Sequence, residues 1–169
     1  CSGNAYQSGS DNYFHGGSIA QVQNFVINGN GKLCGAKTSS GNNAPAVTVA
    51  SLSYNIPHST PFVLTADATD ADEDNVLTYN WEQVDAVGGT GISTPPQSSS
   101  TSGPQFRSFI PSASSERYFP RREVLLDRAN GTYEVLPAVA RTLNFKVTVR
   151  DNNEGSGCLA YEDVTVNVQ

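Results

Sequence analysis

Apolar and polar residues alternate in several stretches between residue 47 and the end of the 169-residue chain. Alternation with a period of two is typical of β-strands that bury one face. The alternating apolar residues are Val47 and Val49; Phe62, Leu64 and Ala66; Leu77, Tyr79 and Trp81; Leu143, Phe145, Val147 and Val149; and Val164, Val166 and Val168. Because Gly-, Pro- and Ser-rich turns separate these stretches, the pattern predicts a mainly β fold, an antiparallel β-sandwich over residues 45–169.

One stretch near the N-terminus, SIAQVQNFVINGNG, has the helical period instead. The residues on its apolar face are Ile19, Val22, Phe25 and Val26. Ser18 is the expected N-cap, and Asn28–Gly31 favours the helix end because Gly and Asn accept the left-handed conformation. One short amphipathic helix cannot bury its own apolar face. The pattern therefore predicts a partner surface, either on the sandwich or on another protein unit.

These patterns divide the chain into three parts. Residues 1–35 are an N-terminal segment with one amphipathic helix, and residues 36–44 are a polar, unpatterned linker that we expect to be flexible. Residues 45–169 form the sandwich. Within it, residues 86–140 lack regular alternation, and only the stretch RREVLLDRANG predicts a short helix there.

The formal net charge is −6 and the sequence pI is near 4.7. This balance argues against nucleic acid or an anionic membrane as a partner, because both need a basic protein face. No apolar run reaches the length of a membrane-spanning helix, so we expect no membrane insertion. The three cysteines leave at least one unpaired within the chain. Cys1 and Cys34 lie in the same segment and could close one loop, which would leave Cys158 as a free thiol.

An acidic stretch, TADATDADEDNVLTYNWEQVD, raises the question of a calcium site. Asp70, Asp72 and Asp74 alternate in it, and carboxylate oxygens are ligands that calcium prefers. The stretch is not an EF-hand loop, because Asn75 stands where Gly is required and Trp81 where the bidentate Glu is required. Further ligands that the fold could add are Asp67, Glu82 and Asp151. The two alternatives are a structural calcium site and a solvated acidic turn.

A basic and aromatic stretch, RYFPRREV, lies in the irregular middle of the sandwich. Its candidate ligand-binding residues are Arg117, Tyr118, Phe119, Arg121 and Arg122. Such a surface suits an acidic polysaccharide or protein, since arginine pairs with carboxylates and stacks on aromatic rings. The simpler alternative is internal ion pairing between these arginines and the acidic stretch.

The sequence contains no catalytic motif. It has no G-x-S-x-G nucleophile elbow, no Gly-rich phosphate loop before a helix and no H-E-x-x-H zinc motif. The two histidines, His15 and His58, cannot supply the three zinc ligands of a metallopeptidase by that motif. We therefore expect that this chain is not an enzyme.

Several stretches resemble a known family. Ala66–Gln83 and Asn144–Asn152 are similar to bacterial PKD-like and other Ig-like extracellular modules. SGPQFRSFIPSASSERYFP, Ser102–Pro120, and EVLPAVARTLNFKVTVRDN, Glu134–Asn152, resemble the region that follows the catalytic domain in bacterial secreted reprolysin-like (metzincin) zinc metallopeptidases. DNYFHGGSIAQVQNFV, Asp11–Val26, resembles the last segment of that catalytic domain, just after its Met-turn.

The resemblance implies an Ig-like sandwich in a secreted, non-catalytic accessory region that docks on the parent catalytic domain or contacts a protein or polysaccharide substrate. Zinc would be bound only in the complete parent enzyme. His15 would then lie near that zinc, or would be a loop histidine bonded to backbone. Relatives in this family often carry a Cys where this chain has Asn80, able to pair with one like Cys158, so this disulfide would be missing here. The competing hypothesis is a free-standing extracellular adhesion or glycan-binding Ig-like module.

Overall fold

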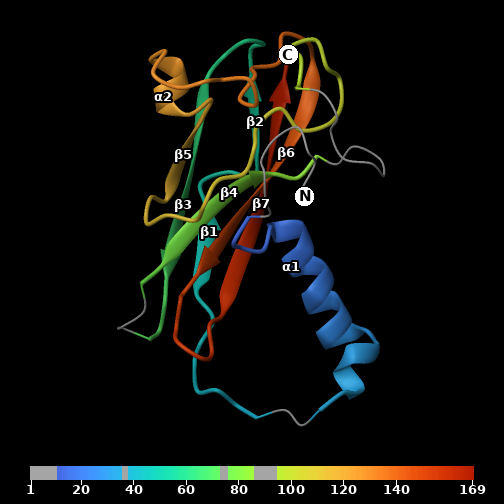
Figure 1. Ribbon diagram of the computed structural model, residues 1–169, viewed down its shortest axis with the longest axis vertical. Helices are drawn as coiled ribbons and strands as arrows, with labels where there is room; N and C mark the ends of the chain where they lie inside the picture. Colours follow the sequence, from blue (N-terminus) through green and yellow to red (C-terminus); the bar gives the residue numbers. More distant parts are fainter. Residues whose placement is uncertain (1–10, 36–37, 73–75, 86–94) are drawn as a thin grey trace.

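The computed structural model describes residues 11–35, 38–72, 76–85 and 95–169, and their structure is mainly β (Figure 1). The strand bounds are β1 Ala46–Val49, β2 Ser53–Ile56, β3 Phe62–Thr69, β4 Thr78–Gln83, β5 Glu116–Phe119, β6 Arg141–Arg150 and β7 Leu159–Val168. One sheet has the order β1–β3–β5 and the other has the order β2–β7–β6–β4. The prediction of a mainly β fold with a short helix near the N-terminus is confirmed.

Among the described strands, every pairing but one is antiparallel. β2 lies parallel to β7, with Ser53 opposite Thr165 and Ile56 opposite Val168. Only residues 50–52 separate β1 from β2, and the chain there passes from one sheet to the other without reversing (Figure 1). The prediction of an entirely antiparallel sandwich is therefore wrong at this edge. Alternation shows which residues share a face of a strand, but it carries no information on strand direction.

The apolar residues of the predicted strands point between the two sheets and form the core. The inward residues of β6, which are Leu143, Phe145, Val147 and Val149, all have an exposed fraction of 0%. Four phenylalanine rings form a cluster in the core, with centroids 4.6 to 6.2 Å apart: Phe62, Phe106, Phe119 and Phe145. The strands thus bury their own apolar faces, which is the main stabilising contribution in a domain of this size.

The opposite face of the second sheet is also covered. Glu82 of β4 and Lys146 and Thr148 of β6 were expected to face outward, yet all three are buried. The N-terminal segment lies over them, and a Cβ at Gly16 would come within 2.8 Å of Lys146 Cδ and 3.3 Å of Thr148 Oγ1. At Gly16 the chain therefore lies too close to the sheet to leave room for a side chain.

Helical turns form at two places. Near the N-terminus, α1 (Gly16–Gln23) continues into a π-helical turn, η1 (Asn24–Asn28), and a 3₁₀ turn, η2 (Asn30–Leu33). The N-cap of α1 is His15, so the prediction of Ser18 in that position is wrong. In the irregular middle, α2 (Arg122–Leu125) confirms the short helix expected there, although it ends well before Asn130.

The apolar face of the N-terminal helix is largely exposed. Only Ile19 is buried, whereas the exposed fractions of Val22, Phe25 and Val26 are 56%, 58% and 46%. Figure 1 shows why: α1 begins beside the second sheet and then runs away from it. The π-helical turn also rotates the residues after Gln23, because its backbone bonds span five residues instead of four. Of the two predicted locations for a partner surface, the sandwich covers only Ile19 of this face, and a surface on another protein unit stays a prediction.

The predicted linker, residues 36–44, is attached to the sandwich near its end. Asn42 Nδ2 donates to Asp151 Oδ2 at 2.6 Å and to the Ser156 carbonyl at 2.9 Å. The backbone N–H of Asn43 donates to Asp72 at 2.7 Å. Asn42 and Asn43 of the predicted linker are therefore bonded to the sandwich, and the flexibility of the linker stays a prediction. In the described part of the chain, no helix combines the length and the apolar character needed to cross a membrane.

Candidate functional site

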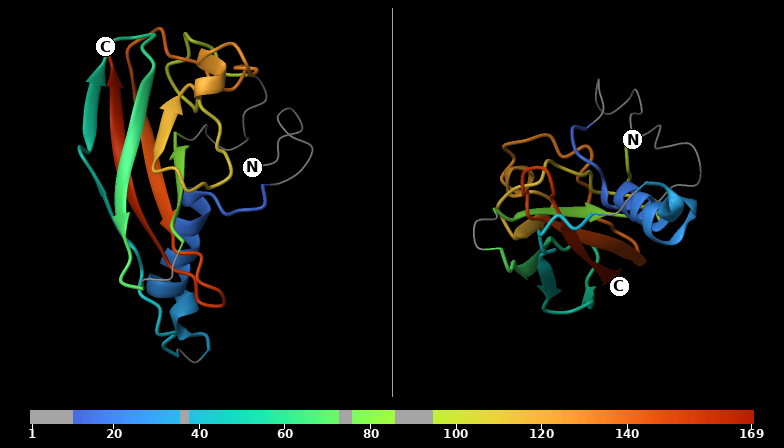
Figure 2. Two further views of the ribbon diagram at one scale, coloured as in Figure 1. Left: turned by 90° about the vertical axis from the view of Figure 1, so that its left-hand side faces the viewer. Right: turned by 90° about the horizontal axis from the view of Figure 1, so that it is seen from below.

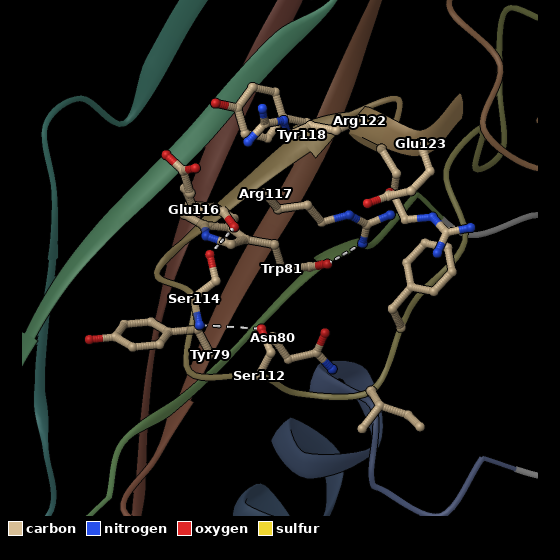
Figure 3. A pocket seen from close by; sticks show the side chains of 13 residues that line it. Tyr79, Asn80, Trp81, Ser112, Ser114, Glu116, Arg117, Tyr118, Arg122 and Glu123 are labelled. Atoms are coloured by element: carbon tan, nitrogen blue, oxygen red, sulfur yellow. Dashed lines mark hydrogen bonds between the residues drawn. The ribbon is translucent and has the colours of Figure 1, made fainter. Parts of the chain in front are cut away.

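A pocket of about 490 Å³ opens on the side of the sandwich where the edge strands β4 and β5 face each other (Figure 3). Its walls come from these two strands, from residues 109–114 and from the start of α2. The polar and aromatic lining residues include Tyr79, Asn80, Glu116, Tyr118, Arg121, Arg122 and Glu123. Small-ligand sites in proteins have volumes in this range.

Arg117 joins the walls of this pocket. Its guanidinium donates to the Trp81 carbonyl of β4, to the Arg107 carbonyl at 2.6 Å and to Glu134 Oε1 at 2.9 Å. Burial lowers the pKa of Arg117 and raises the pKa of Glu134, since low-dielectric surroundings disfavour both charges, and the ion pair opposes both shifts. Arg117 therefore forms an internal ion pair, and its partner, Glu134, is not part of the acidic stretch.

The predicted ligand-binding residues separate into two groups. Phe119 has an exposed fraction of 0% and belongs to the core, so its assignment to a ligand surface is wrong. Tyr118, Arg121 and Arg122 do line the pocket. The guanidinium of Arg121 lies 3.9 Å from the centroid of the Phe109 ring, and that of Arg122 lies 5.4 Å from the centroid of the Tyr118 ring.

Asn80 is a pocket residue that the sequence pattern did not identify as functional. Its exposed fraction is 4%, it lines the pocket, and its Nδ2 atom has no hydrogen-bond partner among the described residues. A buried amide N–H without an acceptor carries a free-energy cost of about 1–3 kcal/mol. Because it belonged to the predicted solvent face of β4, its sequence position gave no sign that it would be both buried and without an acceptor.

A second polar cluster attaches the N-terminal segment to the sandwich. His15 Nδ1 is 2.5 Å from Glu82 Oε1 and His15 Nε2 is 2.9 Å from Asp11 Oδ2. Both ring nitrogens thus face carboxylates, which fits a doubly protonated imidazolium. The backbone N–H of Gly16 donates to Glu82 Oε2 at 2.7 Å. We call Asp11, His15 and Glu82 the N-terminal anchor.

Further bonds surround the N-terminal anchor. Ser108 Oγ donates to Glu82 Oε1 at 2.8 Å, so the Tyr13 hydroxyl, 2.7 Å away, donates to Ser108 Oγ. Arg150 donates to the Phe14 carbonyl at 2.7 Å. Residues 11–16 are therefore held to β4, to β6 and to the segment at residue 108 by polar contacts.

The charges of the N-terminal anchor stabilise one another. The hydrogen bond to Glu82 raises the pKa of His15, although burial of the ring opposes this shift. Burial alone would raise the pKa of Glu82, but the bonds from His15, Gly16 and Ser108 outweigh it and leave this pKa below its usual value. The ring nitrogens of His15 have carboxylate partners, so the role of a loop histidine bonded to backbone is wrong, whereas the role near the zinc of a parent enzyme stays a prediction.

The residues of the predicted calcium site do not all lie together. Both Glu82 oxygens accept bonds in the N-terminal anchor, away from the acidic corner. At the corner, Asp70 Oδ1 accepts the backbone N–H of Asp72, and Asp72 accepts two bonds from Asn43. Asp74 lies outside the described residues, so a calcium site at this corner stays a prediction. Among residues 11–35, 38–72, 76–85 and 95–169, no cluster of three or more potential ligands could hold a metal ion.

Four further residues were predicted to bind calcium or to form a disulfide: Asp67, Asp151, Cys34 and Cys1. Asp67 is exposed on β3, opposite Thr48. Asp151 is buried and receives the backbone N–H of Cys158 at 2.8 Å. Cys34 is exposed and Cys158 is partly buried, and neither is paired with another described cysteine. Because Cys1 lies outside the described residues, its pairing with Cys34 stays a prediction.

Comparison of the sequence with models of protein families and with curated proteins finds no match.

Proposed function

We propose that this chain is a non-catalytic accessory region of a secreted zinc metallopeptidase, in which the N-terminal helical segment docks on the catalytic domain. Zinc is then a ligand of the catalytic domain alone. The sandwich serves as an Ig-like, PKD-like module that the N-terminal anchor holds next to the docked helix.

One observation carries the proposal: the N-terminal helix presents most of its apolar face away from the sheet that its first turn contacts. The exposed apolar residues on α1 and η1 are Val22, Phe25, Val26 and Ile27. A lone short helix is marginal in water and normally gains its stability from packing of such a face. The anchor fixes the start of this helix by polar bonds, so the apolar face remains available for a second protein surface.

The strand topology supports the Ig-like part of the proposal. Seven described strands form two sheets of three and four strands. Constant-type Ig domains also place seven strands in two packed sheets. β1 and β2 follow each other in sequence but lie in different sheets. β1 forms an edge of the three-stranded sheet and β2 forms an edge of the four-stranded sheet.

The coding sequence upstream of Cys1 gives the first test. The proposal expects H-E-x-x-H-x-x-G-x-x-H there, since this motif supplies the zinc ligands of metzincins. An upstream sequence without the motif would refute the link to a metallopeptidase.

A binding measurement gives the second test. The upstream catalytic region, produced separately, is expected to bind this chain, and Val22→Asp with Val26→Asp is expected to abolish the binding because it charges the apolar face. Gln21→Asp, at an exposed polar position of the same helix, is the matched control and should bind like the unmodified chain. Equal binding by all three proteins would contradict docking through this face.

A further inference from the structure

The pocket between β4 and β5 is separate from the helix face and points to a second function. We propose that it binds an oligosaccharide. Asn80, Arg121 and Arg122 donate hydrogen bonds to sugar hydroxyls, Glu116 and Glu123 accept hydrogen bonds from them, and sugar rings contact Tyr118 and Tyr79. This site goes beyond docking, and it does not depend on the identity of the docking partner.

The buried amide of Asn80 is the first reason. A buried polar group that lacks an acceptor destabilises the free protein, and the Asn80 amide is such a group. Asn80 lines the pocket, and Figure 3 shows it at the opposite end of the view from Tyr118 and Arg122. The Nδ2 atom itself has almost no accessible surface, so an acceptor oxygen of a ligand in the pocket would reach this amide only after the Asn80 side chain rotates.

The charge balance is the second reason. Arg117 is neutralised by Glu134, which leaves Arg121 and Arg122 against Glu116 and Glu123 on the pocket walls. The two guanidinium groups donate hydrogen bonds and the two carboxylates accept them. A ligand with hydroxyl groups, which both donate and accept, fits this equal number better than a strongly anionic ligand does. The guanidinium groups of Arg121 and Arg122 contact aromatic rings but make no hydrogen bond with the described residues, so they are available to a ligand.

The covered edge of β4 is the third reason, because it disfavours an extended peptide. Peptides commonly bind by adding a strand to a free sheet edge. Here Tyr79 exchanges both backbone bonds with Ser112, at 2.7 and 3.0 Å, and the Trp81 carbonyl accepts a bond from Arg117. A peptide therefore finds no free backbone groups at these two positions, whereas a sugar needs only side chains.

The test is a glycan array with neutral and uronate-containing oligosaccharides, followed by calorimetric titration with cellohexaose, hexa-N-acetylchitohexaose and hexagalacturonate. The full chain is expected to bind at least one of these sugars saturably, and the neutral and acidic arms identify its class. Tyr118→Ala and Arg122→Ala should each weaken binding about tenfold. Arg128→Ala, an exposed arginine outside the pocket, is the matched control and should bind normally.

Asn80→Leu separates function from folding. This change keeps the volume and removes the unpartnered amide, so the melting temperature should stay the same or rise while sugar binding weakens. Binding that is unchanged by Asn80→Leu and Tyr118→Ala would overturn the proposal. So would the absence of binding to every sugar on the array and to the three hexasaccharides.

Discussion

The sandwich and the N-terminal helix contain similar apolar residues but bury them very differently. Phe119 and Phe145 have an exposed fraction of 0%, whereas Phe25 and Val22 are 58% and 56% exposed. The sandwich strands face one another across the core, so each strand supplies the surface that another strand needs. The helix touches the sheet at its first turn, mostly through polar groups, and then runs away from it (Figure 2).

This difference separates two kinds of stability in one chain. The sandwich stabilises itself by burying apolar side chains, which is a cooperative effect over the whole domain. The helix depends on the N-terminal anchor and, by our proposal, on a second protein. Changes in the core should therefore unfold the domain, whereas changes in the anchor should release only the N-terminal segment.

Truncating a core ring should have the largest effect. Phe145→Ala is expected to lower the free energy of unfolding by about 3–5 kcal/mol, because it removes a fully buried ring and leaves a cavity. Phe25→Ala, the matched change on the helix, should cost about 0.5 kcal/mol, as is usual for exposed positions. Urea denaturation followed by circular dichroism measures both values. Equal losses would mean that the helix face is part of the cooperative core.

Removing the central carboxylate of the N-terminal anchor should have an intermediate, local effect. Glu82→Ala deletes the acceptor for His15, Gly16 and Ser108, and loss of such bonds costs about 1–3 kcal/mol. Amide hydrogen exchange should become faster in α1 and stay unchanged in β7. Glu154→Ala, in an exposed turn, should alter neither. Faster exchange throughout the sheet would show that the anchor belongs to the global folding unit.

The anchor should also depend on pH. The pKa of His15 is raised above 6.5. The stabilisation that the charged ring gives to the attached N-terminal segment is therefore complete below that pH and is lost as the pH rises through the raised pKa. The pKa of Glu82 is lowered below 4.5, so its contribution is complete above that pH and is lost as the pH falls through the lowered pKa. Attachment should be strongest between pH 4.5 and 6.5. With His15→Gln, the protection of α1 amides against exchange should no longer fall as the pH rises, and an unaltered profile would assign that fall to another group.

The acidic corner should give the smallest effect. If Asp70, Asp72 and Asp74 hold calcium, about 1 mM calcium should raise the melting temperature of the sandwich. Weak calcium sites in proteins have dissociation constants of about 10⁻⁴–10⁻³ M, so this concentration would fill such a site at least in part. Asp72→Asn should reduce that rise. An unchanged melting temperature would contradict a calcium site. The role of Asp72 would then be to accept the two hydrogen bonds from Asn43.

The sequence predicted best what depends on neighbouring residues. The alternation of Leu143, Phe145, Val147 and Val149 correctly placed one face of β6 in the core, because side-chain direction in a strand is a local property. The composition of RYFPRREV does not place Phe119 in the core, because that position depends on the register of β5 against β3, with Phe119 opposite Phe62.

Contacts between distant residues could not be predicted. Glu82 is buried because His15 lies on it from 67 positions earlier in the chain, and no periodicity within β4 contains that information. Asn80 likewise lines a pocket with residues of the distant segment 109–114, which pairs with β4 at Tyr79. The candidate site therefore depends mainly on tertiary contacts, although the sequence did identify Tyr118, Arg121 and Arg122.

Hydrogen exchange of the helical amides, residues 19–33, tests the docking of the helix most directly. It should be measured in this chain alone and in the chain extended by its upstream region. The account predicts that the extension slows exchange in α1 and η1 strongly and leaves β6 and β7 unchanged, because the catalytic domain would cover the apolar face. Equal exchange of residues 19–33 in both proteins would contradict it.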